Sequence, residues 1–189
     1  MDRTRAEEIL TKAGALLMGH FRLTSGKHSG KYMQCAQILQ YPEFTAELAE
    51  DLSKNFENAD IVVGPAMGGI VIAYELARHL RAKSFFTERA DGKMVLRRNF
   101  TIPEGARVVV AEDVITTGGS VREVIEIVRE QGGNVIGVAV LVDRSGGSVD
   151  FGVPLACAYK ADIAAYEAED CPLCKEGKIP VVKPGSRAI

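Results

Sequence analysis

The chain has 189 residues, of which 47% are hydrophobic and 25% charged, and its formal net charge is −2. This length suits one domain with a sizeable core, and the near-neutral charge excludes a general attraction to nucleic acids or anionic membranes. The longest uncharged apolar stretch, residues 61–73, contains a proline and three glycines and is too short to cross a bilayer. Because the N-terminal residues lack the apolar core of a signal peptide, we expect a cytoplasmic protein.

The N-terminal segment has the spacing of an amphipathic helix. Thr4 and Glu7 fit a capping box, and apolar residues recur at helical intervals as far as Leu17. We therefore predict a helix from Thr4 to Leu17. Residues 20–32 then alternate around a basic turn that carries Lys27, which predicts a β-hairpin. Composition alone favours a solvated hairpin tip.

A strand, a glycine loop and a helix follow one another in residues 60–80. A helix starting at Pro42 precedes them, residues 60–63 suit a buried strand, and residues 64–69 form a tight loop before the helix at 70–80. The loop matches neither the phosphate-binding Gly-Lys-Ser/Thr ending nor the G-x-G-x-x-G dinucleotide fingerprint. In isolation, an ordinary compact turn remains an alternative.

The next segment is a predicted hairpin, because Asp91-Gly92 lies between two strand-like runs at residues 84–89 and 94–100. Four cations gather on it, namely Arg89, Lys93, Arg97 and Arg98. Charged residues often serve only to keep a sheet edge soluble, so a solvated edge stays open as an alternative.

A second strand–loop–helix unit occupies residues 107–133, and the repeat implies parallel strands with crossover helices. Glu112 and Asp113 follow the β-branched run, and a loop of hydroxyl residues and glycines leads into the helix. A helix N-terminus attracts anions, whereas carboxylates suit ribose hydroxyls or a magnesium ion. The pattern predicts a sugar-phosphate site formed by Thr116, Thr117, Gly118, Gly119 and Ser120. The alternative is a plain crossover with a solvated acidic turn.

Residues 134–142 form another apolar run, which predicts a buried strand that ends at Asp143-Arg144. Ligands of open parallel sheets bind beyond the carboxyl ends of the strands, so Arg144 lies where a ligand carboxylate could receive two hydrogen bonds. A salt bridge between Arg144 and Asp143 is the alternative. One more strand is expected within residues 154–163, followed by an irregular tail.

The four cysteines do not form a disulfide framework. Cys35 and Cys157 lie beside apolar residues and are expected to be buried thiols. Cys171 and Cys174 form a lone Cys-x-x-Cys pair with no second pair and no suitably spaced histidine. A plain turn is favoured here, and a structural zinc knuckle, shared across a dimer, is left open.

Four segments resemble a known family over roughly residues 19–161. The stretch from Glu112 to Ser120 resembles the phosphoribosyl-pyrophosphate (PRPP) motif of type I phosphoribosyltransferases. Three others resemble the orotate phosphoribosyltransferases: Phe-x-Leu-x-Ser-Gly-basic-x-Ser at 21–29, Gly-Pro-Ala-x-Gly-Gly-Ile at 64–70 and Asp-Arg at 143–144. The chain departs at Thr24, where many family members carry a lysine.

The resemblance implies one α/β domain over residues 1–189, with a central mostly parallel sheet flanked by helices and a flexible basic hairpin. A hood would comprise roughly residues 18–40 and the C-terminal tail, and the PRPP-binding core roughly residues 58–162. The implied reaction is Mg²⁺-dependent transfer of the 5-phosphoribosyl group from PRPP to orotate, in pyrimidine synthesis. It implies a homodimer whose hairpin residues reach the partner's site.

The resemblance also assigns roles to individual residues. Arg89, Lys93 and Asp113 are the expected catalytic residues, and orotate is expected to contact Thr116, Arg144 and Lys27. Magnesium is expected to lie near Glu112 and Asp113, indirectly, with PRPP. The expected PRPP contacts are Glu112, Asp113, Val114, Ile115, Thr116, Thr117, Gly118, Gly119, Ser120, Ala66, Gly68 and Gly69. Two alternatives are a phosphoribosyltransferase for a purine and a non-catalytic PRPP-sensing regulator.

Overall fold

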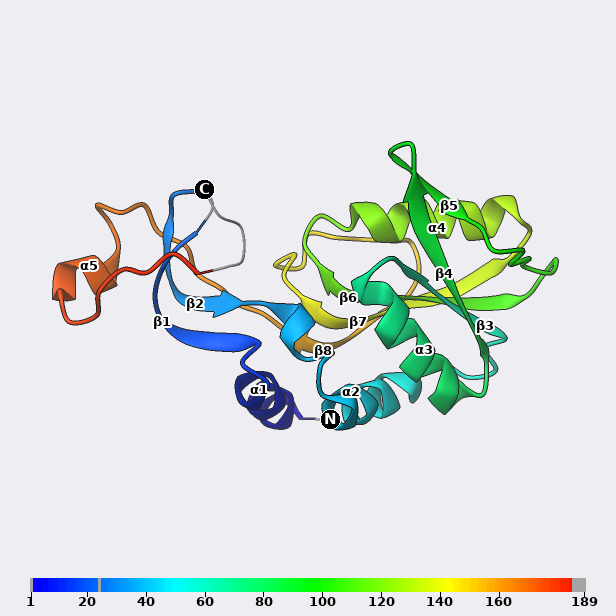
Figure 1. Ribbon diagram of the computed structural model, residues 1–189, viewed down its shortest axis with the longest axis horizontal. Helices are drawn as coiled ribbons and strands as arrows, with labels where there is room; N and C mark the ends of the chain where they lie inside the picture. Colours follow the sequence, from blue (N-terminus) through cyan, green and yellow to red (C-terminus); the bar gives the residue numbers. More distant parts are fainter. Residues whose placement is uncertain (1, 24, 185–189) are drawn as a thin grey trace.

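The fold was analysed in a computed structural model, which describes residues 2–23 and 25–184. Its centre is a six-stranded sheet in the order β5-β4-β3-β6-β7-β8, in which neighbouring strands are parallel except for the antiparallel pair β4 and β5 (Figure 1). The strands are β3 (Ile61–Pro65), β4 (Lys83–Ala90), β5 (Lys93–Leu96), β6 (Arg107–Ile115), β7 (Asn134–Asp143) and β8 (Leu155–Lys160). The predicted α/β class is confirmed.

Helices cover both faces of this sheet. α2 (Pro42–Ser53) and α3 (Gly68–Leu80) pack on one face, and α4 (Gly119–Glu130) packs on the other (Figure 1). The central strands are buried on both sides, so residues such as Val109 and Val110 of β6 enter opposite core clusters and are 0% exposed. Three parallel strands, β3, β6 and β7, therefore end at one edge of the sheet, where their loops meet.

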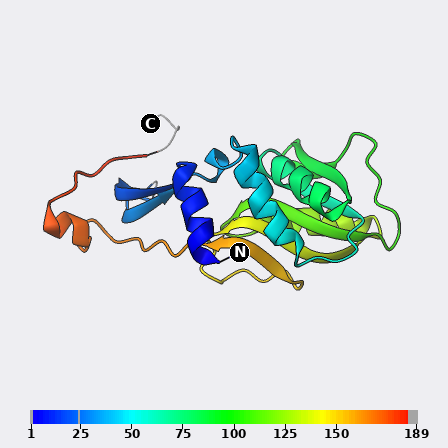
Figure 2. The same ribbon diagram turned by 90° about the horizontal axis from the view of Figure 1, so that it is seen from below.

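A smaller lobe is formed by the two ends of the chain. β1 (Leu16–Arg22) and β2 (His28–Met33) form an antiparallel hairpin, and the C-terminal segment with α5 (Pro172–Glu176) runs around it (Figure 2). Tyr166 pairs with His28 of β2, and Val182 pairs with Phe21 of β1. We call the hairpin and residues 162–184 the hood. α1 (Arg3–Lys12) packs between the hood and β8 (Figure 2).

Two details of the N-terminal prediction are wrong. α1 is capped by the side chain of Asp2, whose Oδ1 accepts the Arg5 N–H at 2.8 Å, and not by Thr4. The helix ends at Lys12 because Gly14 adopts the left-handed conformation, with φ of 68°, which stops the helix. Leu17 therefore belongs to β1, where it pairs with Tyr32 of β2.

The other predicted elements are confirmed, with small shifts at their ends. α3 begins at Gly68, two residues before the predicted start, and β5 ends at Leu96 rather than at Phe100. The turn at Asp91 and Gly92 has φ of 51° and 80°, as a tight hairpin turn requires. Among the described residues, no helix combines the length and apolar character that crossing a membrane requires.

Candidate active site

The hydroxyl and glycine loop lies between the end of β6 and the start of α4. Gly118 is the N-cap of α4 and has φ of 75°, a conformation that glycine adopts without steric cost. The loop thereby presents its backbone N–H groups and the positive end of α4 to a cavity of about 250 Å³. Residues 114–121 line this cavity together with Arg89, Glu112 and Glu123. Such a cavity fits a phosphate group.

The two carboxylates of the motif lie within β6, which continues to Ile115, and their side chains are close enough to hydrogen-bond to each other. Glu112 lines the phosphate cavity, whereas Asp113 does not. Asp113 lies near Cys35, and burial raises the pKa of that thiol to about 12 with a further contribution from the Asp113 charge. One strand thus presents an acid to each of two neighbouring spaces.

The loop after β3 packs directly against this acidic pair. A Cβ atom placed on Gly68 would lie 2.5 Å from the carboxyl carbon of Asp113, and one on Gly69 would lie 3.2 Å from Glu112 Oε1. Only glycine therefore fits beside Asp113 without displacing it. The peptide bond between Ala66 and Met67 in the same loop is cis. The structure thus brings Gly68 and Gly69 to the acids of β6, and Ala66 lies in the same loop, where its N–H donates to the Thr87 carbonyl at 2.7 Å.

Glu112 is protonated more readily than an ordinary glutamic acid. Burial, the hydrogen bond with Asp113 and the charge of Asp113 raise its pKa to about 8. Its Oε1 accepts the backbone N–H of Asp113 at 3.1 Å. A cation or a pair of ribose hydroxyls in the cavity would favour the ionised form.

This pKa predicts a pH-dependent stability difference in the protein without ligand or metal. Between pH 4.5 and pH 8 the folded chain retains a proton on Glu112 that the unfolded chain releases, so stability falls as pH rises. Glu112→Gln removes this ionisation and should raise the melting temperature more at pH 9 than at pH 5. Differential scanning fluorimetry with EDTA measures both values. Glu126→Gln on the exposed face of α4 is the control, and an equal gain at both pH values for Glu112→Gln would contradict the assignment.

Arg144 occupies a second cavity beside the first. Its backbone N–H donates to the Ile115 carbonyl at 2.9 Å, which joins the end of β7 to the residue before Thr116. The cavity has a volume of about 490 Å³ and is lined by residues 143–147 and 160–163, with Arg3 and Leu23. Within the described part of the chain, Arg144 forms no ion pair, because Asp143 instead accepts the Ser145 N–H at 2.8 Å. The guanidinium is available to a ligand.

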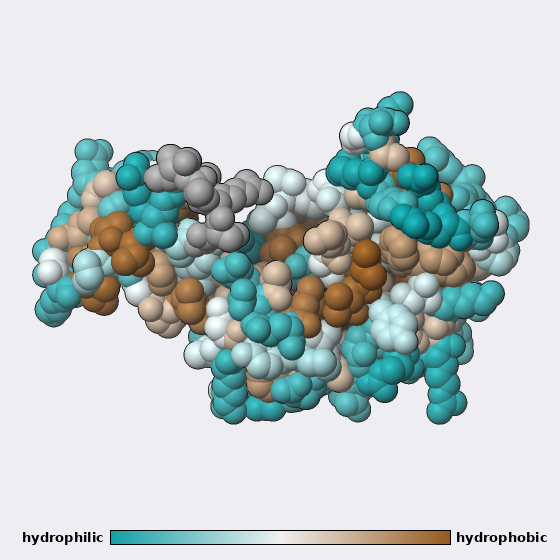
Figure 3. All heavy atoms as spheres, viewed as in Figure 1, coloured by the Kyte–Doolittle hydropathy of each residue, from teal (hydrophilic) through white to brown (hydrophobic). Residues whose placement is uncertain are grey.

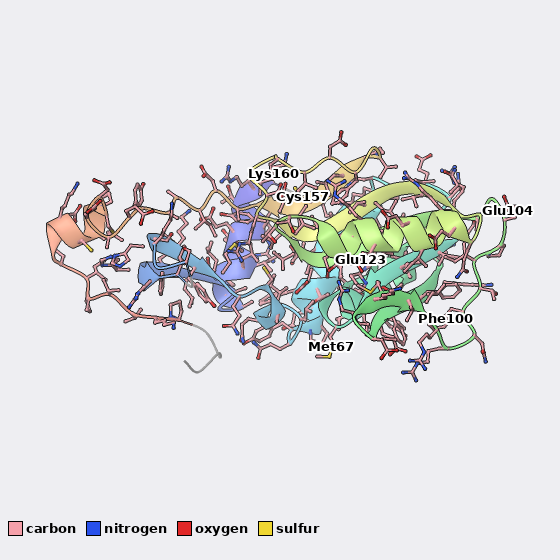
Figure 4. The ribbon with its side chains drawn as sticks, turned by 90° about the horizontal axis from the view of Figure 1, so that it is seen from above. Met67, Phe100, Glu104, Glu123, Cys157 and Lys160 are labelled. Carbon is pink, nitrogen blue, oxygen red and sulfur yellow. The ribbon has the colours of Figure 1, made fainter. Side chains whose placement is uncertain are left out.

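The basic hairpin places one of its four cations at the phosphate cavity. Arg89 donates to both carboxylate oxygens of Glu123, at 2.7 and 3.1 Å, and to the Gly92 carbonyl at 2.8 Å. Glu123 lies near the start of α4 (Figure 4). Lys93 is exposed and has no ion pair among the residues that the structure describes. Arg97 and Arg98 both pair with Glu88.

Lys27 lies apart from Arg144. Its ammonium group pairs with Glu167 of the C-terminal segment at 3.1 Å, and it is not among the residues that line the Arg144 cavity. Leu23, which follows β1, lines that cavity instead. Thr116 lines the phosphate cavity, so the three residues expected to contact orotate do not line one common cavity. Thr24, where the chain departs from the family pattern, lies outside the described residues.

Sequence reasoning missed two features. The pairing of Arg89 with Glu123 was not expected, because nothing in the sequence links residues 34 positions apart. The spacing of the sequence also gave Cys171 and Cys174 no histidine partner, whereas the fold brings His20 and His28 to this pair. The available signal was that the segment predicted to form a hairpin contains two histidines, His20 and His28.

The comparisons with known proteins agree with this geometry. A family model described as "Phosphoribosyl transferase domain" matches residues 35–151, more than half of the chain. The chain is 54% identical to the orotate phosphoribosyltransferase of Desulforamulus reducens over 100% of both chains, and 54% identical to that of Thermotoga maritima over 97% of this chain and 98% of the relative. The crystal structure of orotate phosphoribosyltransferase from Aeropyrum pernix superposes with a TM-score of 0.66 at 31% identity, covering 81% of this chain and 92% of that chain. The chain therefore belongs to the orotate phosphoribosyltransferases, within the phosphoribosyl transferase domain family.

Proposed function

We propose that the protein transfers the 5-phosphoribosyl group of PRPP to orotate, giving orotidine 5′-monophosphate and pyrophosphate, a step of pyrimidine nucleotide synthesis. The observation that carries this proposal is the position of Arg144, whose guanidinium forms no ion pair with the residues that the structure describes and lies in a cavity next to the hydroxyl and glycine loop. Orotate carries a carboxylate that a guanidinium can hold with two hydrogen bonds. The names of the relatives point to the same reaction.

The phosphate loop would hold the 5′-phosphate of PRPP. The N–H groups at the start of α4 and the hydroxyls of Thr116, Thr117 and Ser120 supply donors on one side of the cavity. The position of the phosphate then fixes the ribose near the end of β6. Holding both reactants in place lowers the entropic part of the barrier.

Glu112 and Asp113, whose side chains are close enough to hydrogen-bond to each other, would hold the ribose hydroxyls together. As pyrophosphate departs, positive charge develops on the ribose ring, and nearby carboxylates stabilise that charge. Both acids offer oxygen donors, which magnesium prefers, and the raised pKa of Glu112 indicates a site that lacks positive charge. These residues therefore fit an indirectly held Mg²⁺. When bound with PRPP, the ion would neutralise pyrophosphate charge.

Of the four hairpin cations, Arg89 alone lines the cavity that also contains Glu112, so we assign to it the pyrophosphate that leaves the ribose held by that acid. Arg89→Ala should lower kcat by roughly 10- to 100-fold with a smaller change in the KM for PRPP, because leaving-group charge develops mainly in the transition state. Arg98→Ala is the matched control, as Arg98 pairs with Glu88 on the same hairpin. Steady-state kinetics with varied PRPP measures both variants. Equal losses in the two would exclude a specific role for Arg89.

A homodimer is supported by an apolar stripe on α3. Met67, Val71 and Tyr74 recur at helical spacing and are 83%, 42% and 66% exposed. Figure 3 shows apolar side chains gathered over the start of α3. Such patches mark protein contacts. Lys93 is exposed and has no ion pair among the described residues, so in such a dimer it would be free to extend toward the site of the second copy. The free cysteines suit the reducing cytoplasm.

A panel of bases tests the proposed function. The protein, Mg²⁺ and PRPP are mixed in turn with orotate, adenine, hypoxanthine and xanthine, and consumption of each base is followed by absorbance. Only orotate should be consumed, because a purine offers no carboxylate to Arg144. Turnover of a purine would favour a purine phosphoribosyltransferase, and PRPP binding without turnover of any base would favour a PRPP-sensing regulator.

A further inference from the structure

Four side chains from distant parts of the sequence meet in the hood, well away from the phosphate loop. They are His20 of β1, His28 of β2, Cys171 and Cys174, and one ligand atom from each lies within 4.8 Å of all the others. His20 and Cys171 are 1% and 0% exposed, and His28 is 8% exposed. We call these four residues the His-Cys cluster.

The distances within the His-Cys cluster fit a tetrahedral zinc site. His20 Nε2 lies 3.1 Å from His28 Nδ1, 3.4 Å from Cys171 Sγ and 3.6 Å from Cys174 Sγ, and His28 Nδ1 lies 3.2 Å from Cys174 Sγ. With Zn–N of about 2.05 Å and Zn–S of about 2.3 Å, tetrahedral ligands lie about 3.3 Å apart for two nitrogens and about 3.6 Å for nitrogen and sulfur. The four separations are thus within about 0.4 Å of the tetrahedral values, and the remaining pairs of ligand atoms lie within 4.8 Å.

A contact outside the cluster prepares His20 for a metal. Its Nδ1 lies 3.0 Å from the Ile179 carbonyl oxygen, which can only accept a hydrogen bond. The proton of the neutral ring must therefore be on Nδ1, and Nε2 carries a lone pair directed at the cluster. A metal-bound histidine typically donates its other N–H to a carbonyl in this way.

Hydrogen bonding alone does not explain the arrangement. The single in-plane lone pair of His20 Nε2 can accept one good hydrogen bond, yet three polar atoms approach it within 3.6 Å. Thiols are weak donors, so they gain little by converging there. Two imidazoles and two thiolates are the ligand set of Cys₂His₂ zinc sites.

We propose that the His-Cys cluster binds one structural Zn²⁺, which fastens the C-terminal segment to the N-terminal hairpin within a single chain. All four positions are filled by side chains, so the ion would have no open position for a substrate, as in structural sites. An isolated hairpin is only marginally stable. The C-terminal segment is otherwise held to it by the Lys27–Glu167 ion pair, by the Ser29 hydroxyl, which donates to the Ala164 carbonyl, and by a few main-chain pairs. These include His28 with Tyr166 and Arg22 with Val182, at 2.8 to 2.9 Å. Small lobes commonly require such a metal.

Metal analysis of the untagged protein tests the proposal directly. Protein purified without chelators should contain about one zinc per chain by inductively coupled plasma mass spectrometry. Replacement by Co²⁺ should give the visible absorption bands of a tetrahedral site with thiolate ligands. A protein that holds no zinc, takes up none on dialysis against zinc, and gives no such cobalt spectrum would overturn the proposal, as would a disulfide between Cys171 and Cys174.

Substitutions locate the ion. Cys171→Ser and Cys174→Ser should each reduce bound zinc at least about tenfold and lower the melting temperature by on the order of 10 °C. The control is Cys157→Ser, a half-buried thiol on β8 outside the hood (Figure 4), which should retain zinc. If the serine variants do not fold, 1,10-phenanthroline added to the wild-type protein should produce the same shift. Zinc that remains in the serine variants, or a chelator without effect on melting, would contradict the site.

Discussion

Gly118→Ala is expected to lower kcat/KM for PRPP by on the order of 100-fold or more, because a displaced phosphate loop misplaces the reacting atoms. Two effects act together. Gly118 has φ of 75°, where an alanine costs about 1–2 kcal/mol. The added Cβ would also lie 2.8 Å from the ring of Phe151, which fixes the loop from behind. The loop can accommodate the methyl group only by moving its N–H groups away from the phosphate.

Gly105→Ala is the matched control for this variant. Gly105 has φ of 72°, and a Cβ atom there would have no heavy atom within 4 Å. It precedes β6, at the opposite end of the strand from the phosphate loop. The control should therefore lose the stability that left-handed strain costs, without the clash, and keep kcat/KM for PRPP. Melting temperatures and initial rates separate the two properties, and a Gly118→Ala enzyme with unchanged kinetics would contradict the role of the loop.

Arg144→Ala is expected to raise the KM for orotate by roughly 10- to 150-fold, corresponding to the about 1.5–3 kcal/mol of hydrogen bonds to a charged group. The KM for PRPP should change by less than about threefold, because the two ligands occupy separate cavities. Varying each substrate at saturating concentrations of the other gives both constants.

Two variants complete this experiment. Arg144→Lys keeps the charge but cannot form the paired hydrogen bonds, so it should restore only part of the orotate affinity. Arg129→Ala removes an exposed arginine at the end of α4, far from the cavity, and should leave both constants unchanged. Equal losses of orotate and PRPP affinity in Arg144→Ala would mean that Arg144 only supports the loop after β7.

The core of the fold could be predicted because its signals are local. β-branched runs such as residues 107–111 can be buried only as central strands, and a glycine loop followed by helical spacing leaves few topologies. The same reasoning placed Arg144 at the ligand edge, since it follows a parallel strand. The predicted extension of the helix to Leu17 was wrong for a local reason. Apolar residues there fit both a longer helix and a strand, and the left-handed Gly14 decides between them.

The remaining parts of the site depend on contacts between distant residues. His20 and Cys171 are 151 positions apart, and only the pairing of the C-terminal segment with the hairpin brings them together. The loop after β3 also lies next to the acids of β6 only in the folded chain, where a Cβ on Gly68 would meet Asp113 and one on Gly69 would meet Glu112. Such features follow from tertiary packing rather than from residue patterns.

The central claim is that the phosphate loop holds PRPP while Arg144 selects the base by its carboxylate. Uracil is the sharpest probe, because it is orotate without that group. The measurement is the ratio of kcat/KM for orotate to that for uracil, with PRPP and Mg²⁺ saturating and with both nucleotide and pyrophosphate quantified. We expect orotate to yield the two products in equal amounts and to be preferred by at least about 100-fold. Comparable use of uracil, or no turnover of orotate, would contradict the account.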